Sequence, residues 1–175
     1  MYLNDFFSAK ENVFGELLGS RNTEVPVINS QTVARLRSAV FVNPVRARTE
    51  TEAIDELLAS LRNQPDVIDA NALRTAVLQR QKVDPPILPM GVAFPHARTD
   101  SVRALVLAIG TCPEPVVFGD TPVRLILLIG VPKAAIAEYL DLTSFLARHL
   151  RNRPVIDRLM EATNMSEFLE TFAEL

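Results

Sequence analysis

The chain holds only two histidines, His96 and His149, and they lie in different settings. His96 follows Pro95 at the end of the apolar run Val92–Phe94. A glycine before such a run and a proline after it are typical of a short buried strand that stops where the chain turns. We therefore expect His96 at the end of a strand, where the loops of α/β proteins carry much of their chemistry. A neutral imidazole in that place can act as a base or as a nucleophile.

Position alone leaves a second interpretation of His96, in which the imidazole only satisfies a loop carbonyl. His149 lies in "LARHLRN" among several arginines, and fits a surface histidine near the C-terminus of a helix, where cations are favourable. Cys112 follows an apolar run without an activating neighbour, and the sequence holds no Gly-x-Ser-x-Gly elbow and no glycine-rich phosphate loop. His96 is therefore the leading candidate for chemistry.

The composition narrows the class of protein. Hydrophobic residues make up 48% and charged residues 22% of the 175-residue chain, as in globular domains. A formal net charge of −3 disfavours nucleic-acid binding, and a single cysteine excludes an internal disulfide or a cysteine zinc site. The N-terminus lacks a signal-peptide pattern, and the longest apolar stretch is too short to cross a bilayer. We expect a cytoplasmic protein without membrane insertion, metal or organic cofactor.

Two helices are expected ahead of His96. Thr49 and Glu52 have the spacing of a capping box, and an apolar stripe follows them. A second helix is expected from residue 69 or 71 to residue 80 or 81. The three prolines of "KVDPPILP" exclude a helix interior, so this stretch is predicted to be a loop that leads to the strand before His96.

The rest of the chain completes the predicted fold. The runs "ALVLAIG" and "VRLILLIGV" are typical of strands buried on both faces, joined by a connection over residues 113–122. A broad apolar stripe marks "AIAEYLDLTSFLARHL" as a helix, and two shorter helices follow, the first opening at Pro154. Residues 3–18 fit an amphipathic helix, whereas 30–42 fit a helix or a strand. This order predicts an α/β fold, a mixed sheet flanked by helices on both faces.

The segment "VLQRQKVDPPILPMGVAFPHAR" resembles the IIA domain of the fructose/mannitol type in the bacterial phosphoenolpyruvate:sugar phosphotransferase system. That family also includes nitrogen-regulatory IIA proteins. Its motif runs from an Arg-Glu pair at a helix end to a Gly-[Ile/Val]-Ala-[Ile/Phe]-Pro-His segment, which places the family's arginine on Arg80 and its phosphoryl-accepting histidine on His96. The resemblance covers about residues 40–175. Residues 1–39 remain as an N-terminal helical extension, whose phenylalanines must be buried against a sheet edge or in a homodimer contact.

The resemblance implies that His96 accepts a phosphoryl group from the phosphocarrier protein, and passes it to a IIB domain or holds it as a regulatory mark. In that chemistry an imidazole nitrogen attacks phosphorus in line, while the protein positions the groups and stabilises charge. Arg80 would supply a planar fork for the phosphoryl oxygens. Arg98, two residues past His96, would assist or would face solvent.

The sequence departs from the family pattern near this site. Family members carry a second histidine in a His-Leu pair at the start of the long helix, and the matching pair here is Tyr139-Leu140. A tyrosine hydroxyl can donate a hydrogen bond to a phosphoryl oxygen or to His96, but cannot shuttle a proton near pH 7. Alternatively, Tyr139 is a core-facing aromatic residue. The Arg-Glu pair is Arg80-Gln81, which loses a charge, and "VDPPILP" replaces a threonine-containing loop.

Three functions follow from these observations. The first is a phosphoryl carrier of the sugar phosphotransferase system, which the acceptor histidine and its arginine favour. The second is a regulatory binding module with the same fold, which the changed neighbours of the histidine favour, as does the lack of an attached IIB or membrane IIC segment. The third is an inert relative in which His96 is structural. We favour the carrier, with the binding module as its alternative.

Overall fold

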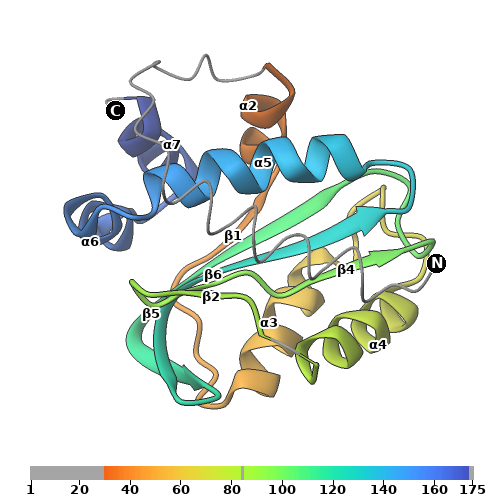
Figure 1. Ribbon diagram of the computed structural model, residues 1–175, viewed down its shortest axis with the longest axis horizontal. Coiled ribbons are helices and arrows are strands. Elements are labelled where there is room, and N and C mark those ends of the chain that lie inside the picture. Colours follow the sequence, from red (N-terminus) through yellow and green to blue (C-terminus); the bar gives the residue numbers. More distant parts are fainter. Residues whose placement is uncertain (1–29, 84, 174–175) are drawn as a thin grey trace.

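The computed structural model describes residues 30–83 and 85–173, and arranges them as one six-stranded sheet with helices on both faces (Figure 1). The strand order is β1-β5-β6-β3-β2, and β4 also pairs with β6. The strands are β1 Val40–Val42, β2 Ile87–Leu88, β3 Val92–Ala93, β4 His96–Thr99, β5 Val106–Phe118 and β6 Thr121–Pro132. The helices are α2 Ser30–Arg37, α3 Glu50–Leu61, α4 Ala70–Gln81, α5 Ile136–His149, α6 Arg153–Glu161 and α7 Met165–Ala173. The predicted α/β fold with a mixed sheet is confirmed.

Two apolar clusters, one on each face of the sheet, form the core. Along β6, Leu127 and Ile129 belong to the cluster shared with α2, α5, α6 and α7. Ile126 and Leu128 belong to the other cluster, shared with α3 and α4. All four side chains are fully buried, and each such residue contributes about 1.5–3 kcal/mol by leaving water. The continuous apolar runs of the sequence are therefore strands covered on both faces, as predicted.

The helix signals around the sheet are confirmed in detail. The Thr49 side chain accepts from the Glu52 amide while the Glu52 carboxylate accepts from the Thr49 amide, so the predicted capping box starts α3. Asp69 caps α4. The ambiguous stretch 30–42 forms both alternatives, α2 and then β1. The helix expected at residues 3–18 lies outside the described residues.

The connection predicted for residues 113–122 is mostly wrong. β5 continues to Phe118 and β6 begins at Thr121, so the turn is short and carries Gly119 with a positive φ of 57°. The strand register shifts between Thr111 and Val116, and the exposed prolines lie inside this interruption. Because proline has no N–H to donate, it is tolerated where the ladder is already broken. Proline content therefore suggested a loop where the chain forms an irregular hairpin.

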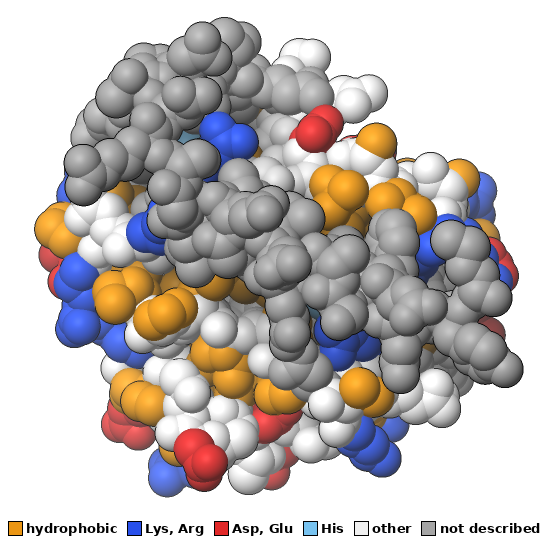
Figure 2. Space-filling view, in the orientation of Figure 1, with side chains coloured by type: hydrophobic (Ala, Val, Ile, Leu, Met, Phe, Trp, Pro, Cys, Tyr) orange, Lys and Arg blue, Asp and Glu red, His pale blue; other side chains and the backbone are white. Residues whose placement is uncertain are grey.

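The surface of the described part is mixed in character. On the face shown in Figure 2, Lys and Arg side chains lie at separate places between acidic, apolar and other residues. The large apolar side chains left exposed are Ile68, Val83 and Val117. Among the described helices, none combines the length and the apolar character that a bilayer span requires.

Candidate functional site

His96 lies in β4, where the chain re-enters the sheet. β3 ends at Ala93, and after Phe94 and Pro95 the next strand pairs His96 with Ile129 of β6. The Ile129 amide donates to the Pro95 carbonyl at 2.9 Å. The strand before His96 therefore stops as predicted, but His96 does not lie in a loop beyond it, because it begins a new strand beside β6. Proline cannot donate to the ladder, but its carbonyl still accepts, so the ladder is interrupted and then resumes.

The position of β4 explains how helices from both faces reach this histidine. α4 packs on β4 from one face of the sheet, and Ala97 belongs to the cluster on that face. Successive side chains of a strand point to opposite faces, so His96 and Arg98 are directed to the face that α5 covers. The predicted site residues thus come from β4, α4 and α5, three elements that meet at one end of the sheet.

The His96 ring is held in one tautomer. Its Nδ1 lies 2.9 Å from the Phe94 carbonyl oxygen, which can only accept a hydrogen bond. In the neutral ring Nδ1 therefore carries the proton and donates it, and Nε2 carries the lone pair. The side chain is only 7% exposed. This hydrogen bond fits the structural interpretation of His96 and, at the same time, leaves the lone pair of the neutral ring on Nε2.

Tyr139 of α5 packs against His96, with ring centroids 5.3 Å apart and planes tilted by 35°. The tyrosine is half-buried and also touches the apolar cluster, so it is both a core-facing residue and a neighbour of the histidine. Burial raises the pKa of its hydroxyl to about 12, and the charge of Arg80 opposes this rise. The hydroxyl therefore stays protonated in the physiological range and can donate a hydrogen bond.

Arg80 enters the site from the last turn of α4. Its electrostatic effect on Tyr139 places the guanidinium within interaction range of the phenol that packs on His96. The side chain is half-buried. A cation, a hydroxyl donor and a tautomer-fixed imidazole are thus brought together, and this set can stabilise a group with several negatively charged oxygens bonded to His96.

Gln81, next to Arg80, has a buried side-chain amide without hydrogen-bond partners in the described part of the chain, which was not predicted from the sequence. It is only 6% exposed, and neither its amide nitrogen nor its amide oxygen has a hydrogen-bond partner among the described atoms. The residue continues the buried stripe of Leu73 and Val77 at helical spacing. Burying an unsatisfied amide costs about 1–3 kcal/mol. From the sequence, only the loss of the family's acidic charge at this position was predicted.

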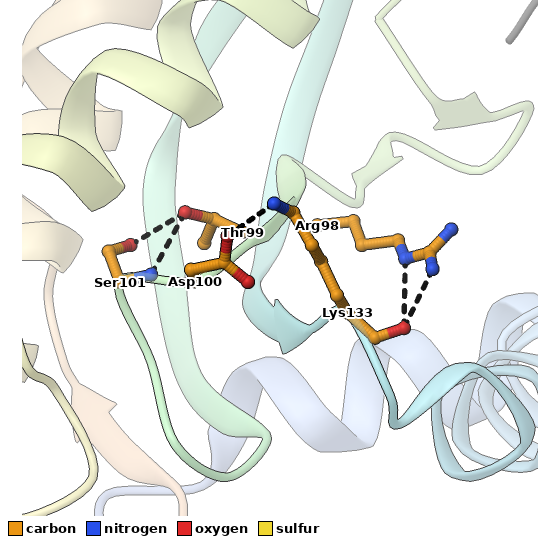
Figure 3. A network of polar contacts seen from close by, with 5 residues as sticks. All are labelled: Arg98, Thr99, Asp100, Ser101 and Lys133. Carbon is orange, nitrogen blue, oxygen red and sulfur yellow. Dashed lines mark hydrogen bonds and ion pairs between the residues drawn. The ribbon is translucent and has the colours of Figure 1, made fainter.

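Arg98 contacts the segment that follows β6. It is exposed, and its Nε and Nη2 donate to the Lys133 carbonyl at 3.1 and 2.7 Å (Figure 3). Lys133 in turn forms an ion pair with Asp100. Sequence reasoning did not find Lys133 or Asp100, because the contact depends on pairing β4 with β6, and β4 was not expected to be a strand.

An open depression of about 470 Å³ lies beside this network, between the turn after β4 and the start of α4. Arg98, Lys133 and Ile68 are among its lining residues. His96, Arg80 and Tyr139 do not line it. The candidate site is therefore the meeting point of β4, α4 and α5, and not this depression.

The remaining candidates lie elsewhere. His149, the last residue of α5, is half-buried instead of lying on the surface, and its Nδ1 is 2.8 Å from the Phe145 carbonyl oxygen. Its ring packs against Phe145 and Phe172 at centroid distances of 4.1 and 5.8 Å. Cys112 is fully buried, and burial raises the pKa of its thiol to about 12, which keeps it protonated and unreactive.

Comparison with known proteins gives consistent results. The PTS system fructose-specific EIIA component of Haloferax volcanii is 30% identical over 130 residues, covering 73% of this chain and 84% of that protein. A nitrogen regulatory protein of Pseudomonas aeruginosa is 31% identical over 129 residues, covering 72% and 82%. The crystal structure of IIA mannitol from Escherichia coli matches with a TM-score of 0.65 at 26% identity, covering 75% of this chain and 94% of that one.

A family model extends this agreement over most of the chain. The model for the phosphoenolpyruvate-dependent sugar phosphotransferase system, EIIA 2, matches residues 36–175, which include every element from β1 to α7. The stretch of sequence that carries the resemblance, from the end of α4 to β4, lies within this range. The fold, the family model and the relatives agree that this chain belongs to the EIIA 2 family of the phosphotransferase system.

Proposed function

We propose that this protein is a phosphoryl carrier whose acceptor atom is Nε2 of His96. Family membership supports a phosphotransferase-system IIA role or a regulatory one. The observation that carries the finer proposal is the hydrogen bond between His96 Nδ1 and the Phe94 carbonyl, which leaves the lone pair on Nε2. The donor is the phosphocarrier protein, and the recipient is a IIB domain or a regulatory target.

The transfer is an in-line displacement at phosphorus. The bond between phosphorus and the donor breaks as the bond to His96 Nε2 forms, and the proton on Nδ1 stays in its hydrogen bond with the Phe94 carbonyl. The positive charge that the ring gains is stabilised by this acceptor. Onward transfer reverses these steps toward the second partner, so the histidine returns to its original tautomer.

Arg80 and Tyr139 assist the transfer in this proposal. The guanidinium of Arg80 pairs with two phosphoryl oxygens and offsets their charge. Its planar arrangement of N–H donors matches the geometry of these oxygens. The hydroxyl of Tyr139, kept protonated by its raised pKa, donates to an oxygen of the phosphoryl group on His96. The Tyr139 hydroxyl keeps its proton in the physiological range, so the assistance consists of positioning and charge stabilisation.

A regulatory role is the second candidate. A relative named as a nitrogen regulatory protein is as similar to this chain as the fructose-specific component is. In this alternative the fold is the same, and the protein acts by contacting a target, with the phosphoryl group on His96 as a mark or with no turnover at all.

The experiment that tests the carrier is intact-mass analysis after incubation with phosphoenolpyruvate, enzyme I and the phosphocarrier protein from the same organism. We expect one phosphoryl group, labile in acid and stable in alkali, on the wild type and on His149→Ala, and none on His96→Ala. Incorporation that persists in His96→Ala would refute the acceptor assignment. No incorporation into the wild type would favour the binding module.

A further inference from the structure

We propose that Arg98 is a positioning residue: it fixes the start of α5 against β4 and so holds Tyr139 on the ring of His96. The consequence for catalysis rests on the proposed function, whereas the consequence for geometry does not. Arg98 follows His96 by two residues on the same strand, and Tyr139 lies in the first turns of α5. A contact between Arg98 and the segment leading into α5 therefore connects the strand that carries His96 to the helix turn that carries Tyr139.

Lys133 is held at two points, its backbone carbonyl and its side chain. The Arg98 guanidinium donates from Nε and from Nη2 to the Lys133 carbonyl, at 3.1 and 2.7 Å. The Lys133 ammonium reaches in the opposite direction to the Asp100 carboxylate (Figure 3). Lys133 thus lies between the two residues that flank Thr99, its carbonyl held by one and its side chain by the other. We call Arg98, Lys133 and Asp100 the clasp.

The clasp is anchored to α4 as well. Thr99 Oγ1 accepts from the Ser101 amide at 3.1 Å and shares a hydrogen bond with the Ser101 hydroxyl at 2.9 Å, which fixes the turn that carries Asp100. The Ser101 carbonyl accepts from the amides of Ile68 and Asp69, the two residues that lead into α4. The helices that deliver Arg80 and Tyr139 to His96 are therefore both tied to the same end of β4.

The start of α5 has no side-chain cap, so the contact of Arg98 with Lys133 contributes to fixing it. Its first position is preceded by Ala135, which offers no side-chain cap, so the amides of the first turn rely on backbone acceptors, while the Glu138 side chain of this turn pairs with Arg35 of α2. The Ala135 amide donates to the Pro132 carbonyl, and the Tyr139 amide donates to the Ala135 carbonyl. Holding Lys133 therefore sets the direction in which this turn begins, one helical turn before Tyr139.

The donors that Arg98 uses distinguish positioning from phosphoryl contact. Two of its five N–H groups, on two different nitrogens, converge on one carbonyl oxygen, which orients the planar guanidinium toward the β6–α5 connection. A lysine at this position keeps the charge but supplies one nitrogen only. Because the contact is exposed, its loss is expected to loosen the helix start without unfolding the domain.

The first test concerns geometry and needs no partner protein. Hydrogen exchange of the amides of residues 135–140 and the NOE between the rings of Tyr139 and His96 are compared in the wild type, Arg98→Ala and Arg98→Lys. The control is Arg103→Ala, which removes an exposed arginine from the turn that follows β4. We expect exchange about five- to tenfold faster and a weaker NOE in Arg98→Ala, partial recovery in Arg98→Lys and no change in the control. Unchanged exchange and NOE in Arg98→Ala would overturn the proposal.

The second test separates positioning from direct contact with the phosphoryl group. We expect Arg98→Ala to lower kcat of His96 phosphorylation about five- to tenfold with little change in KM for the phosphocarrier protein. If Arg98 acts through Tyr139, Arg98→Ala adds no further loss in a Tyr139→Ala background. Additive losses would overturn the positioning role. If the wild type takes up no phosphoryl group, the proposed function fails, and the exchange and NOE experiments still decide whether the clasp exists.

Discussion

The two ends of α5 each hold a histidine against an aromatic ring, and the contrast between them shows what makes one of them a candidate for chemistry. At the start of the helix, Tyr139 packs on His96; at its end, Phe145 and Phe172 pack on His149. Both histidines have Nδ1 next to a backbone carbonyl, at 2.9 and 2.8 Å. The tautomer is thus fixed in the same way at ends about 15 Å apart.

The difference lies in the chemistry of the side chains that pack on each ring. The neighbour of His96 has a hydroxyl that burial keeps protonated, and the charge of Arg80 reaches that hydroxyl. The rings that contact His149 are both phenylalanine, which supplies neither a donor nor a charge. A fixed tautomer therefore prepares a nucleophile, but a phosphoryl group needs donors and a cation beside it as well. The same helix contributes to the candidate site at its start and to core packing at its end.

Removing the Arg80 guanidinium is the substitution expected to have the largest effect on the difference between the two ends of α5. We expect Arg80→Ala to slow phosphorylation of His96 about 100-fold, because an aligned charged donor to the transferring group is worth about 2.7–4 kcal/mol. Arg80→Lys keeps the charge without the planar fork and should recover part of the rate. The measurement is single-turnover phosphorylation by the phosphocarrier protein.

Arg74→Ala supplies the control for this prediction. Arg74 lies on α4 as well, but it is paired with Asp55 on the exposed side of the helix. Its removal should leave the transfer rate unchanged. A similar loss in Arg74→Ala and Arg80→Ala would show that the effect comes from the general charge of the helix and not from the site.

At the other end of α5, substitution should affect stability and leave transfer intact. We expect His149→Ala to lower the free energy of unfolding by about 2 kcal/mol, through loss of the ring contacts with Phe145 and Phe172 and of the hydrogen bond to the Phe145 carbonyl. Urea unfolding measures this change. Phosphorylation of the folded protein should keep its wild-type rate, and a large loss of rate would remove the distinction between the two ends.

The same contrast explains how much the sequence could predict. Periodicity and capping located α3, α4 and α5, because these signals are local, and the Pro-His motif singled out His96. The contact between Tyr139 and His96 could be suspected only from the motif, since the residues are 43 positions apart along the sequence. Pro95 and the prolines after Cys112 suggested that pairing ends, but β4 resumes the pairing with β6 directly after Pro95, and β5 continues past Pro113 and Pro115 with a shift of register. Tertiary pairing thus overrides these local signals, at Pro95 because its carbonyl still accepts a hydrogen bond from the Ile129 amide.

Long-range contacts account for what sequence reasoning missed. The clasp joins β4 to the residue after β6, and its partners have no spacing that would mark them. The buried amide of Gln81 could not be predicted either, because the helical stripe shows that the residue is buried but not whether a partner lies within reach. Both features depend on which atoms meet across the sheet.

The phenol of Tyr139 makes the stability of the protein depend on pH in the alkaline range. Its pKa is about 12 in the folded state and 10.0 in the reference state, so the unfolded chain loses this proton first as pH rises. Stability from this group is full below pH 10 and is lost between about pH 10 and pH 12. We expect the wild type to lose about 2 kcal/mol more than Tyr139→Phe over this range, in urea unfolding at fixed ionic strength. Parallel profiles for the two proteins would show that the phenol is not buried against His96.

The smallest effect expected concerns Gln81, one residue from the cation that distinguishes the two ends of α5. We expect Gln81→Leu to raise the free energy of unfolding by about 1 kcal/mol, because it replaces an amide without partners by an apolar group on the stripe of Leu73 and Val77. Gln81→Ala is the matched control, since it also removes the amide but leaves a cavity and should not stabilise. If Gln81→Leu destabilises the protein, the amide has a partner in solution. If Gln81→Leu stabilises the protein and slows phosphorylation, the energetically unfavourable amide of Gln81 contributes to the position of Arg80.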